Sequence, residues 1–280
     1  MTYATILETK HLCFKYPDGT HALQDVSIAI PHGKTVAILG GNGAGKSTLF
    51  LHLNGILKPS SGSVLYDGLP IAYHSKGLSL LRQQIGIVFQ DPDQQLFSAS
   101  VYQDVSFGVM NLGIPEDKAR MLIESAIEHT GIDAFRGKPT HSLSYGQKKR
   151  VALAGIIAMR PKVLILDEPT AGLDPQGVSE IMKLIKSLQE ELQISVILST
   201  HDIDLVPLYC DYIYVLDQGR VVSEGDPDEI FSHPEELRKV HLRLPRIGHL
   251  MEILKLKDHF KIEGLPTTIT EARRQLKKLF

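Results

Sequence analysis

The sequence predicts an α/β fold with a mainly parallel core sheet, because short apolar runs alternate along the chain with longer segments of helical pattern. The runs are rich in β-branched residues, so we expect strands that are buried on both faces. These strands are predicted at residues 35–39, 85–89, 162–166 and 195–199. Crossover helices, which parallel neighbours require, are predicted at residues 46–53, 115–130, 147–159 and 176–191.

Other segments extend this core. Short strands bounded by turns predict a small antiparallel β subdomain, at residues 6–8, 22–30 and 62–66. From about residue 93 to residue 142 a helical pattern interrupts the strands, which predicts an inserted helical subdomain. After residue 225, prolines, short amphipathic segments and a basic end predict a small C-terminal extension. We therefore divide the chain into a main domain at residues 1–225 and an extension at residues 226–280.

Composition excludes several classes of protein. The chain has 280 residues, 43% of them hydrophobic, and a formal net charge of −2, so we expect a globular protein that does not bind nucleic acid. Cys13 and Cys210 are too few for a disulfide framework or a zinc site, and the histidines show no ligand spacing. No apolar run approaches the roughly 20 residues that cross a bilayer, and the N-terminus lacks a leader pattern. These features predict a cytoplasmic protein.

A glycine-rich segment between the strand at 35–39 and the helix at 46–53 fits the phosphate-loop pattern of Gly, four residues, Gly, Lys and Ser. Its backbone N–H groups and the helix N-terminus favour phosphate oxygens. We expect Lys46 to neutralise the β- and γ-phosphates, Ser47 to bind Mg²⁺ and Thr48 to support the loop. A plain glycine-rich turn is the alternative, and this context disfavours it. The predicted nucleotide-binding residues here are Gly40, Asn42, Gly43, Gly45, Lys46, Ser47 and Thr48.

Two acids end the predicted strand at 162–166. Asp167 lies where a divalent cation at the phosphates needs a carboxylate, so we expect it on the Mg²⁺ side. Glu168 follows, able to face an attacking water as a general base or a water-positioning group. An acidic strand end at the protein surface is the alternative, which the phosphate loop makes less favoured.

The signature segment, Leu-Ser-Tyr-Gly-Gln at residues 143–147, predicts a second phosphate contact. It precedes a predicted helix, so Ser144 and Gly146, with Gln147 beside them, lie at a helix N-terminus, which binds anions. The chain already has one phosphate-binding helix end. A second one therefore predicts a γ-phosphate contact supplied across a dimer interface, with an ordinary helix cap as the alternative.

The order of these motifs resembles the ATP-binding subunits of ABC transporters over about residues 5–225. The resemblance rests on the phosphate loop, Gln90, the signature segment, Asp167 and Glu168, residues 171–174, and His201. It implies an ABC-type nucleotide-binding fold that uses ATP and Mg²⁺. Two positions depart from the commonest family pattern, because Gly41 replaces a proline and Tyr145 replaces the first of two glycines.

The resemblance also implies roles for single residues. Gln90 is implied to be the switch glutamine, which senses Mg²⁺ or the γ-phosphate and links the site to a membrane partner. Asp174 is implied to lie in the loop that crosses the dimer interface. His201 is implied to reach the γ-phosphate or the attacking water. Tyr16 matches the aromatic residue that stacks on adenine, with a packed tyrosine as the alternative.

Two segments narrow the resemblance. Residues 89–97 and 104–108 resemble the energy-coupling factor group of importers, and residues 143–150 are similar to the ATPases of cobalt importers. The C-terminal extension also suits that group, in which it helps to pair two ATPase chains. Cobalt is therefore the expected cargo, and nickel and a vitamin are alternatives because their importers share most of these features.

The resemblance implies a head-to-tail homodimer, with ATP between the phosphate loop of one chain and Ser144 and Gly146 of the other. We expect the protein at the cytoplasmic face of the cell membrane, docked through the region of residues 90–97 on an integral-membrane coupling subunit. A second membrane subunit is expected to bind the substrate. A heterodimer with a related chain remains open, as do a soluble ABC-type ATPase and a regulatory module without turnover.

Overall fold

The computed structural model describes residues 4–278, so residues 1–3 and 279–280 of the predicted main domain and extension lie outside the described part. The strands are β1 (Thr5–Lys15), β2 (His21–Pro31), β3 (Thr35–Leu39), β4 (Ser61–Tyr66), β5 (Leu69–Pro70), β6 (Ile85–Val88), β7 (Val163–Leu166), β8 (Ser195–Ser199), β9 (Tyr212–Asp217) and β10 (Arg220–Gly225). The helices are α1 (Lys46–Leu53), α2 (Ser75–Gln84), α3 (Val101–Met110), α4 (Glu116–Thr130), α5 (Tyr145–Ile157), α6 (Pro175–Leu192), α7 (Val206–Tyr209), α8 (Pro227–Ser232), α9 (Pro234–Lys239), α10 (Arg246–Leu256) and α11 (Ile269–Leu276).

The core is a six-stranded sheet in the order β10-β9-β3-β8-β7-β6. Its strands are parallel except at the β9–β10 edge, so the predicted mainly parallel sheet is confirmed. Every residue of β3 is buried. Val36 and Ile38 face one hydrophobic core while Ala37 and Leu39 face a second, because successive side chains of a strand point to opposite faces.

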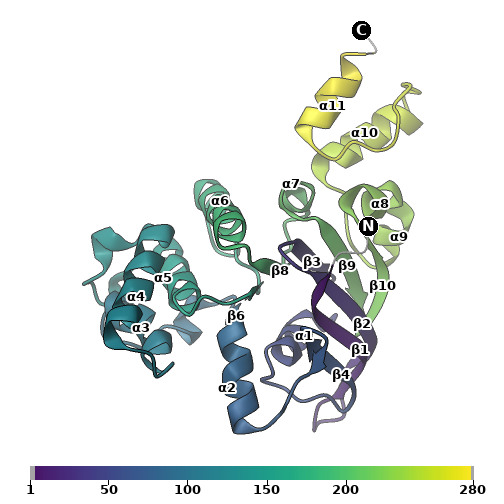
Figure 1. The fold of residues 1–280 in the computed structure, drawn as a ribbon. Coiled ribbons are helices and arrows are strands. Elements are labelled where there is room, and N and C mark those ends of the chain that lie inside the picture. Colours follow the sequence, from purple (N-terminus) through teal and green to yellow (C-terminus); the bar gives the residue numbers. More distant parts are fainter. Residues whose placement is uncertain (1–3, 279–280) are drawn as a thin grey trace.

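A four-stranded antiparallel sheet in the order β2-β1-β4-β5 forms the predicted small β subdomain. Its first strands are longer than the sequence predicted. Helix α1 packs in the hydrophobic core shared by this sheet and β3, through Leu49, Phe50 and Leu53. The phosphate loop, which leads into α1, is therefore held next to both sheets (Figure 1).

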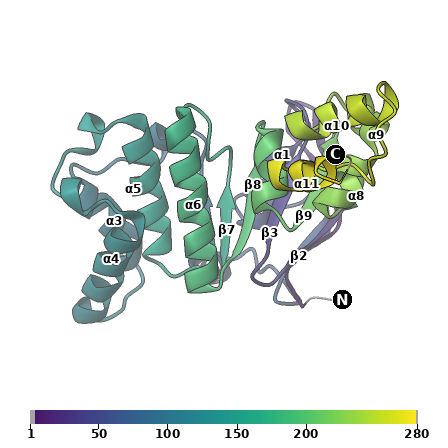
Figure 2. The same cartoon turned by 90° about the horizontal axis from the view of Figure 1, so that it is seen from above.

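Helices α3, α4 and α5 pack on one another at one side of the core sheet (Figure 1). Figure 2 shows α6 between this group and the strands. The group thus includes α5, which lies beyond the limit at residue 142 that the sequence suggested. Helix α5 also starts two residues earlier than predicted, because Ser144 and Gln147 cap it reciprocally in a capping box.

The C-terminal segment has two parts. Ile230 and Phe231 of α8 and Leu237 of α9 pack in the main core, next to strands of the sheet. Helices α10 and α11 instead have a small core of their own, made by Met251, Ile262 and Ala272, and they project from the main domain (Figure 1). Within residues 4–278, no helix combines the length and the apolar character that crossing a lipid bilayer requires.

Candidate functional site

Three neighbouring strands deliver the phosphate loop, two predicted acids and His201 to one edge of the core sheet. The phosphate loop follows β3, Asp167 and Glu168 follow β7, and His201 follows β8. Parallel strands end at the same edge, which is where α/β sheets bind ligands. A cavity of about 340 Å³ opens there. Predicted residues that line it are Tyr16, Asn42, Gly43, Gly45, Lys46, Ser47, Thr48, Gln90, Asp167, Glu168 and His201.

Glycines set the course of the phosphate loop. Gly45 has φ +105°, and a Cβ atom there would lie 2.6 Å from the Ala22 carbonyl oxygen. A Cβ atom on Gly40 would collide with the Leu216 carbonyl oxygen. Only glycine allows both the conformation and these backbone approaches. Gly40 therefore belongs to the site as a determinant of loop shape, although it does not line the cavity.

Lys46 is the first residue of α1 and is buried. Its ammonium group donates hydrogen bonds to the carbonyl oxygens of Gly40 at 2.9 Å and Gly41 at 3.1 Å. Burial lowers the pKa of Lys46, and the charges of Glu168 and Asp167 oppose that effect. A cation in this position is suited to a polyanionic ligand such as a phosphate chain.

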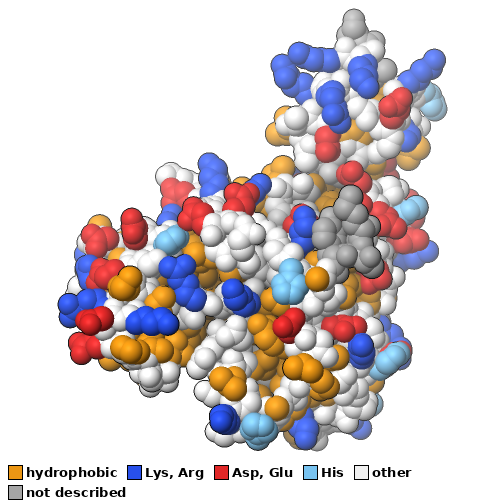
Figure 3. Space-filling view, viewed as in Figure 1, with side chains coloured by type: hydrophobic (Ala, Val, Ile, Leu, Met, Phe, Trp, Pro, Cys, Tyr) orange, Lys and Arg blue, Asp and Glu red, His pale blue; other side chains and the backbone are white. Residues whose placement is uncertain are grey.

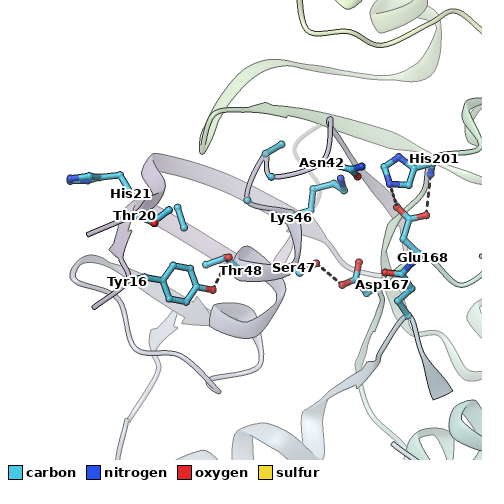
Figure 4. A pocket seen from close by; sticks show the side chains of 15 residues that line it. Tyr16, Thr20, His21, Asn42, Lys46, Ser47, Thr48, Asp167, Glu168 and His201 are labelled. Atoms are coloured by element: carbon cyan, nitrogen blue, oxygen red, sulfur yellow. Dashed lines mark hydrogen bonds and ion pairs between the residues drawn. The ribbon is translucent and has the colours of Figure 1, made fainter. Parts of the chain in front are cut away.

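Oxygen ligands for a hard cation meet at one wall of the cavity. Ser47 Oγ donates a hydrogen bond to Asp167 Oδ2 at 2.7 Å (Figure 4). Ser199 Oγ donates one to Asp167 Oδ1 at 2.6 Å. Gln90 lines the same cavity. Mg²⁺ is commonly held by few protein oxygens together with phosphate oxygens and waters. The hydroxyl of Ser47 and the carboxylate of Asp167 fit that pattern.

Glu168 is a buried acid held in an uncommon backbone conformation, with φ +49° and 5% exposure. Its Oε2 accepts a hydrogen bond from the His201 N–H at 3.1 Å, and its Oε1 lies 3.2 Å from His201 Nε2 (Figure 4). Oε1 is buried and makes no hydrogen bond of good geometry. Such strain and such an acceptor occur at functional sites more often than elsewhere.

Tyr16 packs against its neighbours and also faces the cavity. Its ring packs edge-on against Phe14, with centroids 4.9 Å apart, and its hydroxyl is 3.0 Å from Thr48 Oγ1. It also lines the cavity (Figure 4). Thr20 and His21 line the same end and were not predicted. The signal for them was the turn at residues 17–19, which directs the chain back past Tyr16.

The remaining predicted residues lie outside this cavity. Ser144 caps α5, and its N–H in turn donates to Gln147 Oε1 at 3.0 Å, so the Gln147 side chain serves its own helix here. Gly146 lies in the first turn of α5. Asp174 caps α6 by accepting a hydrogen bond from the Gly177 N–H at 2.7 Å. The structure therefore does not bring these residues to the cavity of the same chain.

Lys149 is a residue that the sequence reasoning missed. It is buried in α5, and its ammonium group donates to the carbonyl oxygens of Glu168 at 3.0 Å and Gln90 at 3.2 Å. Burial lowers its pKa to about 8, against the opposing charges of Glu168, Asp91 and Asp167. A weak signal was present, because Lys149 shares a helix face with the apolar residues Ala152 and Leu153.

Comparison with known protein families gives one clear match. The model of the ABC transporter family matches residues 23–171. Two relatives are similar over nearly the whole chain. The energy-coupling factor transporter ATP-binding protein EcfA2 of Clostridium perfringens is 60% identical over 97% of this chain and 95% of its own length. The protein EcfA of Methanocaldococcus jannaschii is 52% identical over 97% of this chain and 96% of its own length.

Solved structures are similar as well. The structure of cbiO1 from Clostridium perfringens, described as part of the transporter complex cbiONQ, has a TM-score of 0.78 and 62% identity. The match covers 89% of this chain and 100% of cbiO1. The ATP-binding cassette MJ0796, solved as a dimer with ADP and phosphate, has a TM-score of 0.72 and 27% identity, over 79% of this chain and 98% of the cassette.

Proposed function

Because this chain belongs to the ABC transporter family, as an ATP-binding subunit of the energy-coupling factor type, we propose that it hydrolyses ATP at the cavity described above to power the import of cobalt. The observation that carries the assignment of the site is the buried carboxylate of Glu168 in the same cavity as Lys46 and the phosphate loop. A cavity that only bound nucleotide would not need this acid. The regulatory alternative without turnover is therefore disfavoured.

The chemistry follows from the positions of the side chains. Lys46 and the loop N–H groups hold the phosphates of ATP, and Tyr16 contacts the adenine end. Glu168 accepts a proton from the water whose oxygen attacks the γ-phosphorus, and ADP leaves. The backbone N–H of His201 holds the Glu168 carboxylate by donating a hydrogen bond to it. When bound by Ser47 and Asp167, with Gln90 beside them, Mg²⁺ supplies positive charge at the phosphates.

We propose that two copies complete the site. The N-terminus of α5 is exposed at Ser144, and its N–H groups suit a phosphate, but it lies outside the cavity of its own chain. In a head-to-tail homodimer, Ser144 and Gly146 of one chain contact the γ-phosphate held by the other. Gln147 orders that helix end, and Asp174 orders the start of α6 in the loop that crosses the interface. The cassette MJ0796 was solved as a dimer, which supports the pairing of two copies.

The proposed partners and cellular location are supported by the names of the relatives and by the surface near Gln90. Phe97 and Phe107 are exposed and touch edge-on, with ring centroids 4.8 Å apart. We propose that this apolar surface docks an integral-membrane coupling subunit, which keeps the protein at the cytoplasmic face of the cell membrane. A separate membrane subunit binds the substrate. Cobalt is favoured over nickel or a vitamin by the likeness to cbiO1 of the cbiONQ complex.

The C-terminal helices offer a pairing surface. A cleft of about 530 Å³ between α10 and α11 is lined mainly by apolar side chains, among them Ile247, Leu250, Ile269 and Leu276. Leu250 is 48% exposed and Ile269 72% exposed. Lys and Arg side chains gather around the outer end of these helices (Figure 3). We propose that a second copy of this chain covers the cleft, so that the extension pairs the two ATPase chains.

The catalytic assignment is tested by Glu168→Gln. We expect unchanged ATP affinity, a loss of turnover of at least about a hundredfold, and an ATP-dependent dimer that no longer dissociates. Phosphate release, nucleotide titration and light scattering after gel filtration measure the three quantities. Glu190→Gln makes the same change at an exposed position of α6 and should leave all three unchanged. Normal turnover of the Glu168→Gln protein would refute the assigned role.

The transport assignment is tested in the native cell. Tagged protein purified from membranes should retain a coupling subunit and a small substrate-binding subunit, which mass spectrometry identifies. The complex in vesicles should then take up radioactive Co²⁺ in an ATP-dependent manner, in preference to Ni²⁺ or vitamins. Recovery of ribosomal or chromosomal proteins alone would favour a soluble ABC-type ATPase, and preferential uptake of another cargo would overturn cobalt.

A further inference from the structure

Two side chains of α5 connect the helix that begins after Ser144 to the loops around the cavity. Tyr145 and Lys149 lie one turn apart, with Lys149 Nζ 5.4 Å from the centroid of the Tyr145 ring. The Tyr145 hydroxyl donates a hydrogen bond to the Gln90 carbonyl oxygen at 3.2 Å. Lys149 Nζ donates to the same oxygen at 3.2 Å. Both side chains therefore hold the backbone of one residue of the cavity.

Lys149 also holds Glu168 itself. Its Nζ donates to the Glu168 carbonyl oxygen at 3.0 Å, which accepts a second hydrogen bond from the Ala171 N–H at 3.1 Å. The Glu168 N–H donates to Ser199 Oγ at 2.9 Å. A non-glycine residue at φ +49° is strained and persists only when its surroundings fix it. Lys149 and Ser199 fix Glu168 from both sides of its backbone, which sets the direction of its carboxylate.

Packing alone does not account for a lysine at this position. Lys149 is 4% exposed, and a buried ammonium group is costly unless its hydrogen bonds are satisfied. A methionine of similar length would fill the same space without that cost. The particular contribution of the lysine is the pair of hydrogen bonds to Gln90 and Glu168.

Tyr145 adds a third connection. Its ring packs against Gly172, where an added Cβ atom would lie 2.8 Å from Tyr145 Cε1. Gly172 belongs to the loop at residues 171–174, which leads from Glu168 to α6. The first turns of α5 therefore touch the segment of Gln90, the backbone of Glu168 and this loop.

We propose that Lys149, supported by Tyr145, is a positioning residue for ATP hydrolysis. It fixes the backbones of Glu168 and Gln90 relative to the N-terminus of α5. The proposal rests on the catalytic role given to Glu168 above. In the two-chain site, Ser144 at this helix end contacts the nucleotide of the partner chain. Through Lys149, the contact of α5 with the nucleotide of the partner chain is connected to the orientation of Glu168 in its own chain.

The first test separates turnover from binding in the full-length protein. We expect Lys149→Met to lower kcat about tenfold to a hundredfold while KM for ATP changes less than about twofold, because a small misplacement of the acid affects the chemical step. Lys149→Arg should recover part of the rate. Lys148→Met is the matched control, because Lys148 is the neighbouring lysine and pairs with Asp93 at 2.6 Å. Unchanged kcat, or kcat and KM that move together, would overturn the proposal.

The second test asks in which chain Lys149 acts. A Lys46→Ala chain and a Ser144→Arg chain should each be inactive alone, and their mixture should contain dimers with one intact site. That site uses the phosphate loop and Glu168 of the Ser144→Arg chain. Lys149→Met should therefore lower the rate about tenfold or more in the Ser144→Arg chain. In the Lys46→Ala chain the same change should have little effect.

The outcomes of the two tests are distinguishable. The rate could fall more when Lys149→Met is placed in the Lys46→Ala chain than in the Ser144→Arg chain. Lys149 would then only shape the helix end at Ser144, and the positioning role would be wrong. A parent mixture without activity would contradict the proposed two-chain site. In that case the single Lys149→Met variant would still decide the role of Lys149, because it shows whether kcat falls while KM stays nearly constant.

Discussion

The charges of Lys46 and Glu168 explain why this cavity suits a reaction rather than a static contact. Both side chains are buried, and each lies near groups of the opposite sign. Fixed charges on buried side chains act more strongly than they would in water. At the scale of single residues, the site is therefore prepared before nucleotide arrives.

Removing the Lys46 ammonium group should weaken nucleotide binding. A hydrogen bond that involves a charged group contributes about 1.5 to 3 kcal/mol, so Lys46→Ala should raise the dissociation constant for ATP roughly tenfold to a hundredfold. Isothermal titration measures the constant, and a thermal melt checks that the protein is folded. Lys76→Ala, at an exposed position of α2, is the control. An unchanged affinity in Lys46→Ala would contradict its assigned role.

Sequence predicted the residues that belong to linear motifs, and it missed those that act through the backbone. Ser47 and Asp167, which are far apart in the chain, were both expected near Mg²⁺, and their side chains meet in the structure. Lys149 was missed because its partners are the carbonyl oxygens of Gln90 and Glu168. Any residue type can offer a carbonyl oxygen, so such a contact leaves no pattern in the sequence.

At the scale of elements, Tyr214 joins the two sheets. It lies in β9, and its hydroxyl donates to the Ala29 carbonyl oxygen at 3.0 Å and accepts from the Ala29 N–H at 2.9 Å. Ala29 belongs to β2 of the antiparallel sheet. The position of the β subdomain, and with it the wall that carries Tyr16, thus depends in part on this contact.

Strand β9 also shows where pattern reading failed. The strands at residues 35–39 and 162–166 were predicted because each is a short apolar run rich in β-branched residues, and a recognisable motif follows each of them. Residues 212–217 are a short apolar run that ends in Asp217, but no motif follows them, and β9 and β10 were not predicted. The pairing of β9 with β3 joins segments that are distant in sequence, whereas β9 and β10 pair as a local hairpin.

Ionisation of the Tyr214 hydroxyl should lower the free energy of unfolding at alkaline pH. Burial raises the pKa of Tyr214 to about 12 in the folded protein, whereas in the unfolded chain it is near 10. Between about pH 10 and pH 12 the unfolded state binds fewer protons than the folded state, so the free energy of unfolding falls as pH rises. Tyr214 contributes at most about 2.7 kcal/mol to this fall.

Tyr214→Phe tests this dependence. At pH 8 the variant should be less stable by about 1 to 3 kcal/mol, because the polar groups of Ala29 lose their partner. Since phenylalanine does not titrate, the difference between variant and parent should narrow as pH rises from 10 towards 12. Urea unfolding at several pH values measures both free energies. A difference that stays constant would contradict the role of the Tyr214 hydroxyl.

At the scale of the whole molecule, the two proposed surfaces for a second copy lie in different parts of the chain. One is the N-terminus of α5 beside the cavity, and the other is the apolar cleft between α10 and α11, which project from the main domain. We expect the first surface to pair only with ATP present, since the nucleotide forms part of that interface. The second contains no nucleotide contact, so it should hold the two chains together while the first opens.

Leu250→Lys tests this division of roles. Burying a leucine contributes about 2 kcal/mol, so a lysine in the cleft should raise the dissociation constant of the nucleotide-free dimer at least about thirtyfold. ATP affinity of the single chain should not change, because α10 is remote from the phosphate loop. Leu256→Lys is the matched control, with the same change on the same helix at a residue that is 64% exposed and does not line the cleft. Sedimentation equilibrium without nucleotide measures the dimer constant, and equal effects of the two substitutions would show that the cleft is not the pairing surface.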